Sequence, residues 1–380
     1  FVIGMPSALE NTIAALEAGS TSVGNLGQYF TFRLPDWNDD ITTTAETIKA
    51  IILAGFVERD VLIHSNLDDG FAAQFGDLAS ALGAVLIEKE IIETLLEGQV
   101  SHCFGHTFTG SLSRLAFHRA LSQVSNTPGT MIYGNTTAYG PVISENYAAL
   151  AAYLSIDIAA LSDKPTGHAI NPVPVTEAKR IPDVDEIVDA HLFAGKLVER
   201  LEGFPALIDF APADALAFRL VEAGRTFKER VFKGLAAAGV DVSNAFELLL
   251  AIRRIGAKRL EFLFGPGARE TGQPNGRRPV WASCVIDEIA SDAKRRLAKL
   301  DESDAERIKT AGLSAIVATT DVHEYGKRLL EAVLVELDVE IINGGVSTDP
   351  SELAELASDS HADFVALSTY NGIALGFFQR

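Results

Sequence analysis

Short apolar segments alternate with longer amphipathic segments along the first two thirds of the chain. The short segments are rich in Val, Ile and Phe, which is typical of strands that are buried on both faces. In the longer segments apolar residues return every three or four positions, which indicates helices. The pattern predicts strands at 1–4, 21–26, 61–65, 100–104, 130–134, 156–161, 206–210 and 259–264, and helices at 7–18, 43–58, 70–83, 111–124, 144–153, 183–201 and 243–255.

This alternation of strands and helices favours an α/β fold whose parallel sheet closes into a (β/α)8, TIM-like barrel. We therefore predict a barrel domain over residues 1–300, in which a helix at 281–300 would be the eighth barrel helix. The spacing of the segments is uneven, and extra helical sequence lies between 212 and 240. Seven or nine strands are therefore open alternatives.

A second alternating pattern begins after a charged connector at 301–312. It predicts strands at 316–319, 339–342 and 364–368, with helices at 326–337 and 350–358 between them. This pattern amounts to about half of a doubly wound, flavodoxin-like (Rossmann-type) domain, which has about five strands. We expect a second domain at 313–380 that is incomplete at its C-terminus, in a chain that is a piece of a longer protein.

The charge of the chain limits its partners. Its 380 residues include 32 Lys and Arg and 51 Asp and Glu, which gives a formal net charge of −19. Such a chain repels phosphate backbones and anionic lipid surfaces, so we expect neither nucleic acid nor a membrane as a partner. The two cysteines, Cys103 and Cys284, provide no disulfide framework. We therefore expect a protein of the reducing cytoplasm.

The most informative motif follows the first strand of the second domain. It reads Asp321-Val-His323-Glu-Tyr-Gly326. In open α/β sheets ligands bind at the carboxyl ends of the strands, where this loop is expected to lie. Asp321 can accept one ring N–H of His323, which fixes the tautomer and makes the other nitrogen a better metal ligand. Gly326 would let a bulky group approach the backbone where the helix begins.

The pattern D-x-H-x-x-G resembles the signature of cobalamin (vitamin B12) binding domains, in which the histidine replaces the cofactor's own benzimidazole as the lower cobalt ligand. The resemblance implies that His323 is the cobalt ligand and that Asp321 and Gly326 belong to the cofactor site. A second family element, S-x-L, is matched at the family's spacing by Ser368-Thr-Tyr370, with 41 residues between Gly326 and Ser368. Ser368 would contact the buried nucleotide tail, and Tyr370 stands in place of leucine. The alternative is a plain helix cap formed by Asp321 and His323.

A barrel combined with a cobalamin domain resembles the adenosylcobalamin-dependent mutases. The resemblance implies an isomerase that rearranges the carbon skeleton of a small carboxylic or amino acid by radical chemistry. In that family the barrel mouth faces the corrin. A corrinoid-dependent methyltransferase and a non-catalytic cobalamin-binding protein are the alternatives.

One barrel segment is similar to part of the catalytic chain of glutamate mutase. It reads Glu177-Ala-x-x-Ile181-Pro182 and precedes a predicted helix. The resemblance implies that Glu177 helps to hold the adenosyl ribose. The family's lysine four residues before this glutamate is replaced by Val173. The alternative is that Glu177 is a solvated carboxylate near a helix start.

Residues at the carboxyl ends of barrel strands face the active site. Among the candidates we assign catalysis to His168, together with Glu177, and substrate binding to Gln28 and Asn135. Arg33 could pair bidentately with a substrate carboxylate. We expect a small-molecule substrate and a homo-oligomer or partner subunit, and we reject zinc at His102 and His106 because a third ligand is missing. The remaining candidates are Asn25, His64, Asn66, Tyr133, Thr136, Asn171, Asp209 and Glu261. For each of them a purely structural, hydrogen-bonded role is the alternative.

Overall fold

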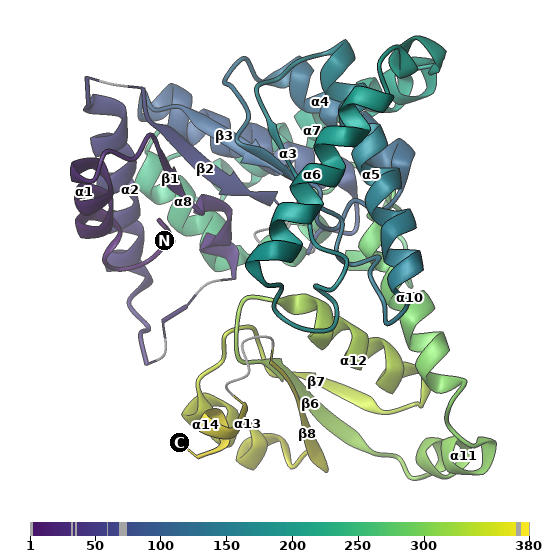
Figure 1. Ribbon diagram of the computed structural model, residues 1–380. Helices are drawn as coiled ribbons and strands as arrows, with labels where there is room; N and C mark the ends of the chain where they lie inside the picture. The colour runs from purple at the N-terminus through teal and green to yellow at the C-terminus, as the bar shows by residue number, and fades with distance from the viewer. Residues whose placement is uncertain are drawn as a thin grey trace. The chain divides into compact units, whose positions relative to one another are not determined.

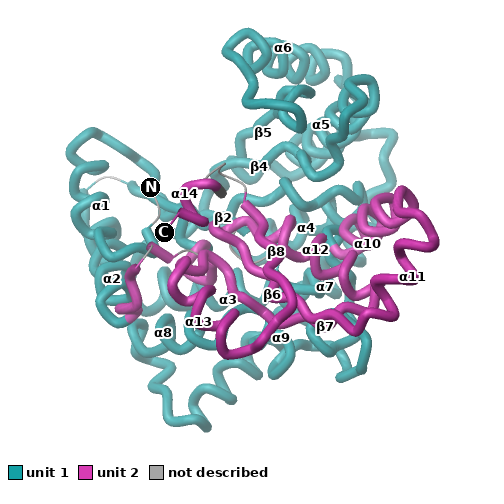
Figure 2. Tube along the Cα trace, turned by 90° about the horizontal axis from the view of Figure 1, so that it is seen from below, with its two compact units in different colours: residues 1–27, 41–285 teal, residues 28–40, 286–380 magenta. Residues whose placement is uncertain are grey.

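The computed structural model describes residues 3–31, 33–34, 36–58, 60–67, 74–369 and 374–379. The chain divides into two compact units, which Figure 2 shows in different colours. Unit 1 comprises Phe1–Gly27 and Ile41–Val285, and unit 2 comprises Gln28–Asp40 and Ile286–Arg380. The division thus lies at Val285, and the predicted connector at 301–312 falls within unit 2.

The segment 28–40 belongs to unit 2 because it is bonded to residues more than 300 positions away. The backbone N–H of Asp36 donates to the Asp349 carboxylate at 2.9 Å. The Ser347 hydroxyl donates to the carbonyl of Thr31 at 3.1 Å. The hydrophobic pattern of the sequence does not predict long-range contacts of this kind.

Unit 1 alternates helices with short strands (Figure 1). Its strands are β1 (Ser22–Gly24), β2 (Leu62–Asn66), β3 (Val100–Cys103), β4 (Met131–Tyr133) and β5 (Ala169–Asn171). Its helices are α1 (Ala8–Glu17), α2 (Asp40–Phe56), α3 (Leu78–Lys89), α4 (Ser111–Val124), α5 (Ile143–Asp163), α6 (Val184–Arg200), α7 (Ala211–Ala237), α8 (Ala245–Ile255) and α9 (Ala257–Phe264).

The strands of unit 1 are parallel and follow chain order. β1, β2 and β3 form one sheet, and β4 and β5 form another. A parallel bridge between Phe104 and Ile132 joins β3 to β4. Among the described residues these strands form two short sheets and no closed barrel, so the eight-stranded barrel stays a prediction.

Several predicted strands of unit 1 are wrong. The segment 156–161 lies inside α5, and 259–264 is part of α9. The segment 206–210 contains the end of a 3₁₀ helix, Phe204–Leu207, and the described part of 1–4 is a turn. A helix that is buried on more than one side has a continuous apolar run, which short-range periodicity does not distinguish from a buried strand. β5 was missed because it is short and contains a polar residue.

A buried arginine joins the strand ends of unit 1 to its helices. Arg114 of α4 is 1 % exposed and forms two hydrogen bonds with Asp157 of α5, at 2.6 and 2.7 Å. Its other N–H groups donate to the carbonyls of Gly105 and Tyr133, at 2.5 and 2.6 Å. All four bonds are charge-assisted in a dry environment, which makes each of them strong. Arg114 therefore fixes the chain just after β3 and at the end of β4 against two helices.

Unit 2 contains a three-stranded parallel sheet. Its strands are β6 (Ser314–Thr319), β7 (Glu340–Asn343) and β8 (Phe364–Ser368), and their order is β7-β6-β8. Its helices are α10 (Cys284–Leu297), which starts at the unit boundary, α11 (Glu302–Thr310), α12 (Glu324–Glu336), α13 (Pro350–Ser360) and α14 (Ala374–Phe378). The three strands and the two helices between them confirm the predicted elements.

The middle strand of this sheet is buried on both faces. Ala315 and Val317 of β6 belong to one apolar cluster, and Ile316 and Ala318 belong to another on the opposite face. The chain passes from β6 to one edge of the sheet and then crosses to the other edge, because β7 and β8 lie on either side of β6. This reversal of direction is the topological switch point of an open α/β sheet.

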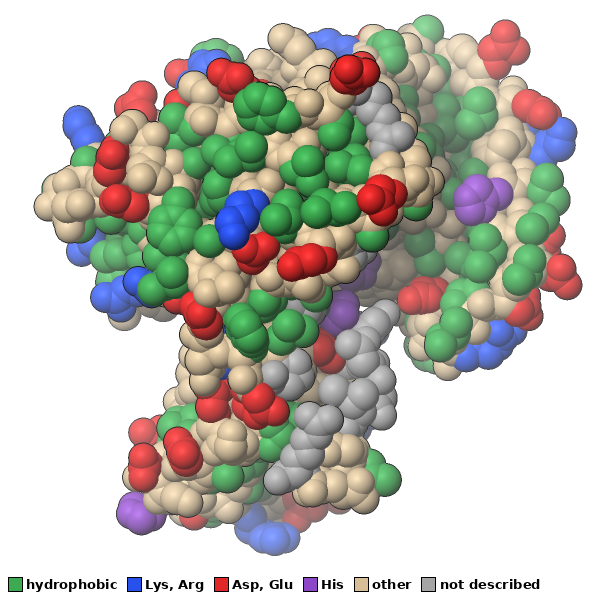
Figure 3. Space-filling model, turned by 90° about the vertical axis from the view of Figure 1, so that its left-hand side faces the viewer, with side chains coloured by type: hydrophobic (Ala, Val, Ile, Leu, Met, Phe, Trp, Pro, Cys, Tyr) green, Lys and Arg blue, Asp and Glu red, His purple; other side chains and the backbone are tan. Residues whose placement is uncertain are grey.

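Many acidic side chains, which give the chain its negative net charge, lie on the surface. On the face seen in Figure 3, acidic side chains are spread over the surface between hydrophobic ones. No helix in the described part of the chain combines the length and the apolar character that a membrane crossing needs.

We predict that Arg114→Ala lowers the free energy of unfolding by about 3–5 kcal/mol, because it leaves the buried Asp157 charge without its partner. Urea unfolding followed by circular dichroism measures this change. The matched control is Arg225→Ala, which removes an exposed pair with Glu222. Its cost should stay below about 1 kcal/mol. Equal effects of the two substitutions would contradict the role assigned to Arg114.

Candidate functional site

The loop after β6 is fixed by its own side chains. The Thr319 hydroxyl donates to the carbonyl of Asp321 at 3.2 Å, and the N–H of Asp321 donates back to that hydroxyl at 3.3 Å. Asp321 Oδ1 then accepts the backbone N–H of His323 at 2.9 Å, which closes an Asx turn. The carboxylate of Asp321 is therefore held at the sheet edge, with its side chain 8 % exposed.

The same carboxylate oxygen orients the imidazole of His323. Nδ1 of His323 lies 2.8 Å from Asp321 Oδ1. A carboxylate accepts and does not donate, so this contact assigns the proton to Nδ1 and the lone pair to Nε2. The His323 side chain is 29 % exposed, whereas Asp321 is nearly buried. The pair thus has the geometry of a metal-ligating histidine with its supporting carboxylate.

Gly326 and Ser368 are in direct contact, although 41 residues separate them. Gly326 lies in the first turn of α12 and Ser368 is the last residue of β8. A Cβ atom on Gly326 would lie 2.2 Å from Ser368 Oγ, so only glycine fits without a shift. The N–H of Thr320 also donates to the carbonyl of Ser368 at 3.1 Å. The structure therefore brings together the two parts of the predicted motif.

These residues lie at the topological switch point of the sheet. His323 follows β6 and Ser368 ends β8, and these two strands are neighbours. The hydroxyls of Thr320 and Thr369, just beyond the two strands, are buried and have no hydrogen-bond partner among the described residues. Buried hydroxyls without partners are uncommon and indicate a ligand or water that completes their hydrogen bonding. Tyr370, the last predicted residue of this site, lies outside the described residues.

No group of three or more His, Cys, Asp and Glu side chains is arranged to hold a metal ion in the ranges that the structure describes. His102 instead lies 2.8 Å from the carboxylate of Glu88, and both side chains are buried. A metal held by the protein through one histidine, with its other ligands supplied by a cofactor, does not require such a group.

In unit 1, the carboxyl ends of β4 and β5 carry the second candidate site. Asn135, two residues after β4, is 4 % exposed, and its side-chain oxygen accepts bonds from the Thr137 hydroxyl and the N–H of Ala138, both at 3.3 Å. The Thr137 hydroxyl also lies 3.3 Å from the carbonyl of His106. Asn135 therefore shapes the loop after β4 and links it to the loop after β3.

The segment that contains Glu177 is held by side chains of α5 and of the loop before it. The carbonyl of Val173 accepts the Tyr139 hydroxyl at 2.9 Å, and its N–H donates to the Tyr153 hydroxyl at 3.0 Å. Asn146 donates to the carbonyl of Val175 at 2.8 Å. Burial raises the pKa of Tyr139, and the nearby charges of Tyr153 and Glu177 add to this effect. The half-buried Glu177 is thus placed by three hydrogen bonds to its own segment.

His168 precedes β5 and lies at the amino end of the strand, whereas Asn171 ends it. The prediction that both residues follow a strand at 156–161 is wrong, because that segment is helical. Nε2 of His168 donates to the carbonyl of His102 at 2.9 Å, and Nδ1 accepts the Thr166 hydroxyl at 2.7 Å. Burial lowers the pKa of His168. Its catalytic role stays a prediction, and its position separates it from Asn135.

Two other histidines of unit 1, His64 and His118, are also buried. His64 lies within β2, with Nδ1 2.8 Å from the Thr130 hydroxyl and Nε2 3.3 Å from Cys103 Sγ. Burial lowers the pKa of His64 to about 4, and the charge of His102 adds to this. Burial likewise lowers the pKa of His118 to about 3. These histidines are neutral interior groups at physiological pH.

Three of the remaining candidates, Arg33, Asp209 and Glu261, have structural partners. Arg33 pairs bidentately with Glu352 within unit 2, at 3.0 and 3.1 Å, and Gln28 is buried in the same unit. Asp209 accepts the N–H of Ala211 at the start of α7. Glu261 is buried in α9 and accepts the N–H of Gly76. Burial and the charge of Asp77 raise its pKa to about 8.

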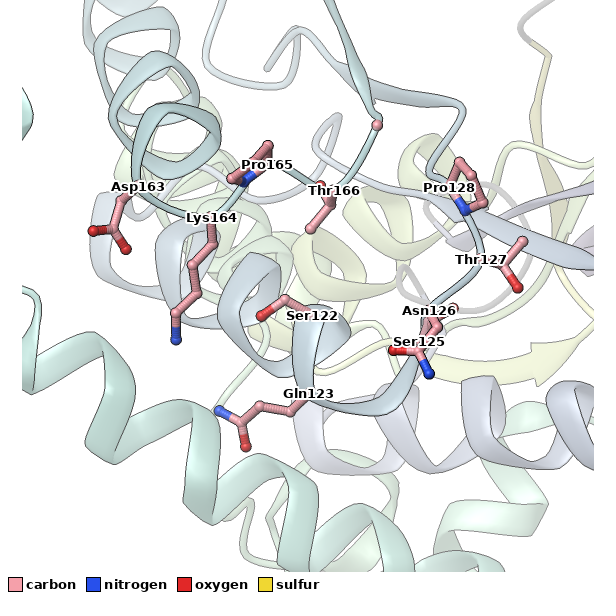
Figure 4. A pocket seen from close by; sticks show the side chains of 11 residues that line it. Ser122, Gln123, Ser125, Asn126, Thr127, Pro128, Asp163, Lys164, Pro165 and Thr166 are labelled. Atoms are coloured by element: carbon pink, nitrogen blue, oxygen red, sulfur yellow. The ribbon is translucent and has the colours of Figure 1, made fainter.

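A cavity of about 660 Å3 lies at the amino ends of β4 and β5 (Figure 4). The end of α4, with Ser122, and the loops that lead into the two strands, with Asn126, Lys164 and Thr166, line this cavity. Because active sites of parallel α/β sheets form at the carboxyl ends, this cavity is not the predicted site.

The sequence pattern did not identify the residues that position the second candidate site. Arg114, Tyr139, Asn146 and Tyr153 contact backbone near the strand ends. A usable signal exists for one partner of Arg114: Asp157 stands within the apolar run 156–161, where a charge is rare unless it is paired.

No protein family model matches the chain, and no curated protein matches it.

We predict that Gly326→Ala and Ser368→Ala are energetically coupled. The added methyl group displaces the Ser368 hydroxyl, so the single Gly326 variant should lose about 1–3 kcal/mol of unfolding free energy. The double variant should recover about 1 kcal/mol or more, because the displaced oxygen is absent. Urea unfolding of the four proteins of this cycle measures the coupling. Additive effects would contradict the contact.

We also predict acid destabilisation of unit 1. A histidine whose pKa is lowered by folding stabilises the fold above its unfolded value, near 6.5, and this stabilisation is lost as the pH falls towards the folded value. Between about pH 7.5 and pH 5, His118 should account for a loss of about 2 kcal/mol. His118→Gln should reduce the loss by that amount, as measured by urea unfolding at both pH values. The exposed His191→Gln is the control, and an equal reduction in this control would contradict the assignment.

Proposed function

We propose that this chain is an adenosylcobalamin-dependent radical mutase, an isomerase that acts on a small carboxylic or amino acid. In this proposal His323 of unit 2 binds the cofactor and Glu177 of unit 1 contacts the adenosyl group, whereas the candidate substrate residues are divided between the two units. The observation that carries the proposal is the hydrogen bond between Asp321 and His323, together with the contact between Gly326 and Ser368. This pair occupies the switch point, where open α/β sheets bind ligands.

The residues of unit 2 fit a corrinoid whose lower ligand is a histidine. The contact with Asp321 leaves the lone pair of His323 on Nε2, the atom that would ligate cobalt. The buried hydroxyls of Thr320 and Thr369 have no partner in the described part of the chain and would bond a polar tail that enters between β6 and β8. The order β7-β6-β8 places the first strand between the second and the third, as in the flavodoxin-like fold.

When bound, adenosylcobalamin supplies radical chemistry through homolytic cleavage of its cobalt–carbon bond. The side chains of the protein would bind the cofactor, orient it and shield it from water. Asp321 holds the imidazole of His323 in one tautomer, and Ser368 contacts the tail of the cofactor. Glu177, whose segment is fixed by the bonds to Val173 and Val175, would accept hydrogen bonds from the hydroxyls of the adenosyl ribose.

Asn135 of unit 1, and Gln28 and Arg33 of unit 2, are the candidate substrate contacts. Arg33 now pairs with Glu352, so a substrate carboxylate would have to replace that glutamate in the same bidentate geometry. The five parallel strands of unit 1 agree with part of the proposed (β/α)8 barrel. His168, the other catalytic candidate, lies at the strand end opposite to that of Asn135.

We predict that the purified chain binds adenosylcobalamin and that His323→Ala abolishes most of this binding. The protein is mixed with the cofactor and passed through a gel filtration column, and the visible absorbance that travels with the protein is measured. The matched control is His361→Asn, an exposed histidine of the same unit whose left-handed backbone, at φ 53°, asparagine tolerates. Colourless wild-type protein, or equal binding by the His323 variant, would overturn the assignment.

The reaction class is tested on the loaded protein. A mutase should show cob(II)alamin and an organic radical by electron paramagnetic resonance when its substrate is added. A corrinoid-dependent methyltransferase would instead pass through cob(I)alamin, and a non-catalytic cobalamin-binding protein would show neither state. Either of the last two results would overturn the mutase assignment and leave cobalamin binding intact.

A further inference from the structure

Glu261 is a buried acidic residue to which the proposed reaction gives no role. It stands in α9 and is 1 % exposed. Its two carboxyl oxygens lie 3.2 and 3.1 Å from the backbone nitrogen of Gly76 and share its N–H. Gly76 belongs to residues 74–77, which end the connection from β2 to α3. This connection leaves the carboxyl end of β2, the end of a strand at which α/β folds bind ligands.

A second buried acidic residue holds the same stretch of chain. Asp77 is 2 % exposed and caps α3, because its Oδ1 accepts the N–H of Ala79 at 3.0 Å. Its carboxylate also accepts the N–H groups of Val280 and Trp281, at 2.9 and 3.2 Å. Burial raises the pKa of Asp77, and these three N–H groups and the charge of Arg219 oppose the rise. Two buried carboxyl groups therefore lie at the start of α3.

The surroundings of Glu261 provide little to balance a negative charge. α9 packs against α7, α8 and the 3₁₀ helix Pro274–Gly276, and the buried side chains of α7 and α8 are apolar. Beside the 3₁₀ helix, each nitrogen of the Arg277 guanidinium group donates to a carbonyl at or just after the end of α9, at 2.7 to 2.8 Å. Arg277 therefore attracts Glu261 only from a distance. In the ranges that the structure describes, Glu261 has no Lys, Arg or His side chain within ion-pair distance.

Burial and the charge of Asp77 raise the pKa of Glu261 to about 8, although hydrogen bonds from Asp77, Asn275 and Gly76 oppose the rise. A glutamate in water titrates near about 4.3. Glu261 is thus protonated at neutral pH while residues 74–77 are packed against α9, and it would be ionised at the same pH if water reached it. Opening of this contact therefore releases a proton, so a rise in pH favours the open arrangement.

We propose that Glu261 is a pH-sensitive switch in unit 1. In its neutral form it keeps residues 74–77 packed against α9, and with them residues 278–283, which Asp77 joins to the start of α3. In its ionised form the cost of burying a charge beside Asp77 exceeds the gain from the N–H of Gly76, and both stretches open more often. The switch controls access to the carboxyl end of β2 and does not depend on the proposed cofactor.

Hydrogen exchange of the backbone amides measures this opening in the full chain. Mass spectrometry follows peptides that cover residues 74–81 and 278–285 between about pH 5.5 and pH 9.5, with a correction for the intrinsic pH dependence of exchange. In the wild type, protection should fall by up to about tenfold for each pH unit as far as about pH 8 and then stay constant, because Glu261 is ionised in both arrangements above that value. Protection that does not change with pH in the wild type would overturn the proposal.

Two variants separate Glu261 from any other titrating group. Glu261→Gln keeps the shape of the side chain without its proton and should abolish the pH dependence. Asp77→Asn removes the like charge while asparagine still caps α3, so the dependence should end at a lower pH than in the wild type. The matched control Glu222→Gln changes a 53 % exposed carboxyl group of α7 and should keep the wild-type dependence. An unchanged dependence in Glu261→Gln, an unchanged end point in Asp77→Asn, or a loss of the dependence in the control would contradict the assignment.

Discussion

One oxygen atom of a buried carboxylate organises the sheet edge of unit 2. Oδ1 of Asp321 accepts both the backbone N–H and the ring Nδ1–H of His323, so it closes the turn and orients the imidazole at the same time. This turn also depends on hydrogen bonds of Thr319, at the end of β6. Because the strand, the turn and the ring are linked by hydrogen bonds, the position of Nε2 is set by the sheet. A ligating atom that is held in this way needs little reorganisation when it binds.

Unit 1 places its candidate residues by a different route. The loops after β3 and β4 are tied to helices by the buried guanidinium of Arg114, and the segment of Glu177 is tied by two tyrosines and an asparagine. Here the carbonyl groups at and after the strand ends are satisfied by side chains of α4, of α5 and of the loop before α5. Such a network is rigid because an unsatisfied buried group would be costly. Both units therefore hold loops at the carboxyl ends of parallel strands, where function concentrates in α/β folds.

A feature of this structure could be predicted from the sequence where it produces a local pattern of residues. The three strands of unit 2 were predicted correctly because each is a short apolar run between clear helical patterns, and β6 is buried on both faces. The motif around His323 was predictable because it is local, and the spacing to Ser368 follows from one strand and one helix pair. The helix α5 was misjudged because its apolar segment faces protein on several sides. The assignment of residues 28–40 to unit 2 rests on pairs such as Arg33 and Glu352, which no local pattern reveals.

The most direct measurement of the central claim is the electron paramagnetic resonance spectrum of cob(II)alamin bound to the full chain, made once with natural histidine and once with ¹⁵N-labelled histidine. If Nε2 of His323 ligates the cobalt, the nitrogen splitting must change from the pattern of ¹⁴N to that of ¹⁵N. A splitting that stays that of ¹⁴N would show that the cofactor keeps its own base, and it would contradict this account.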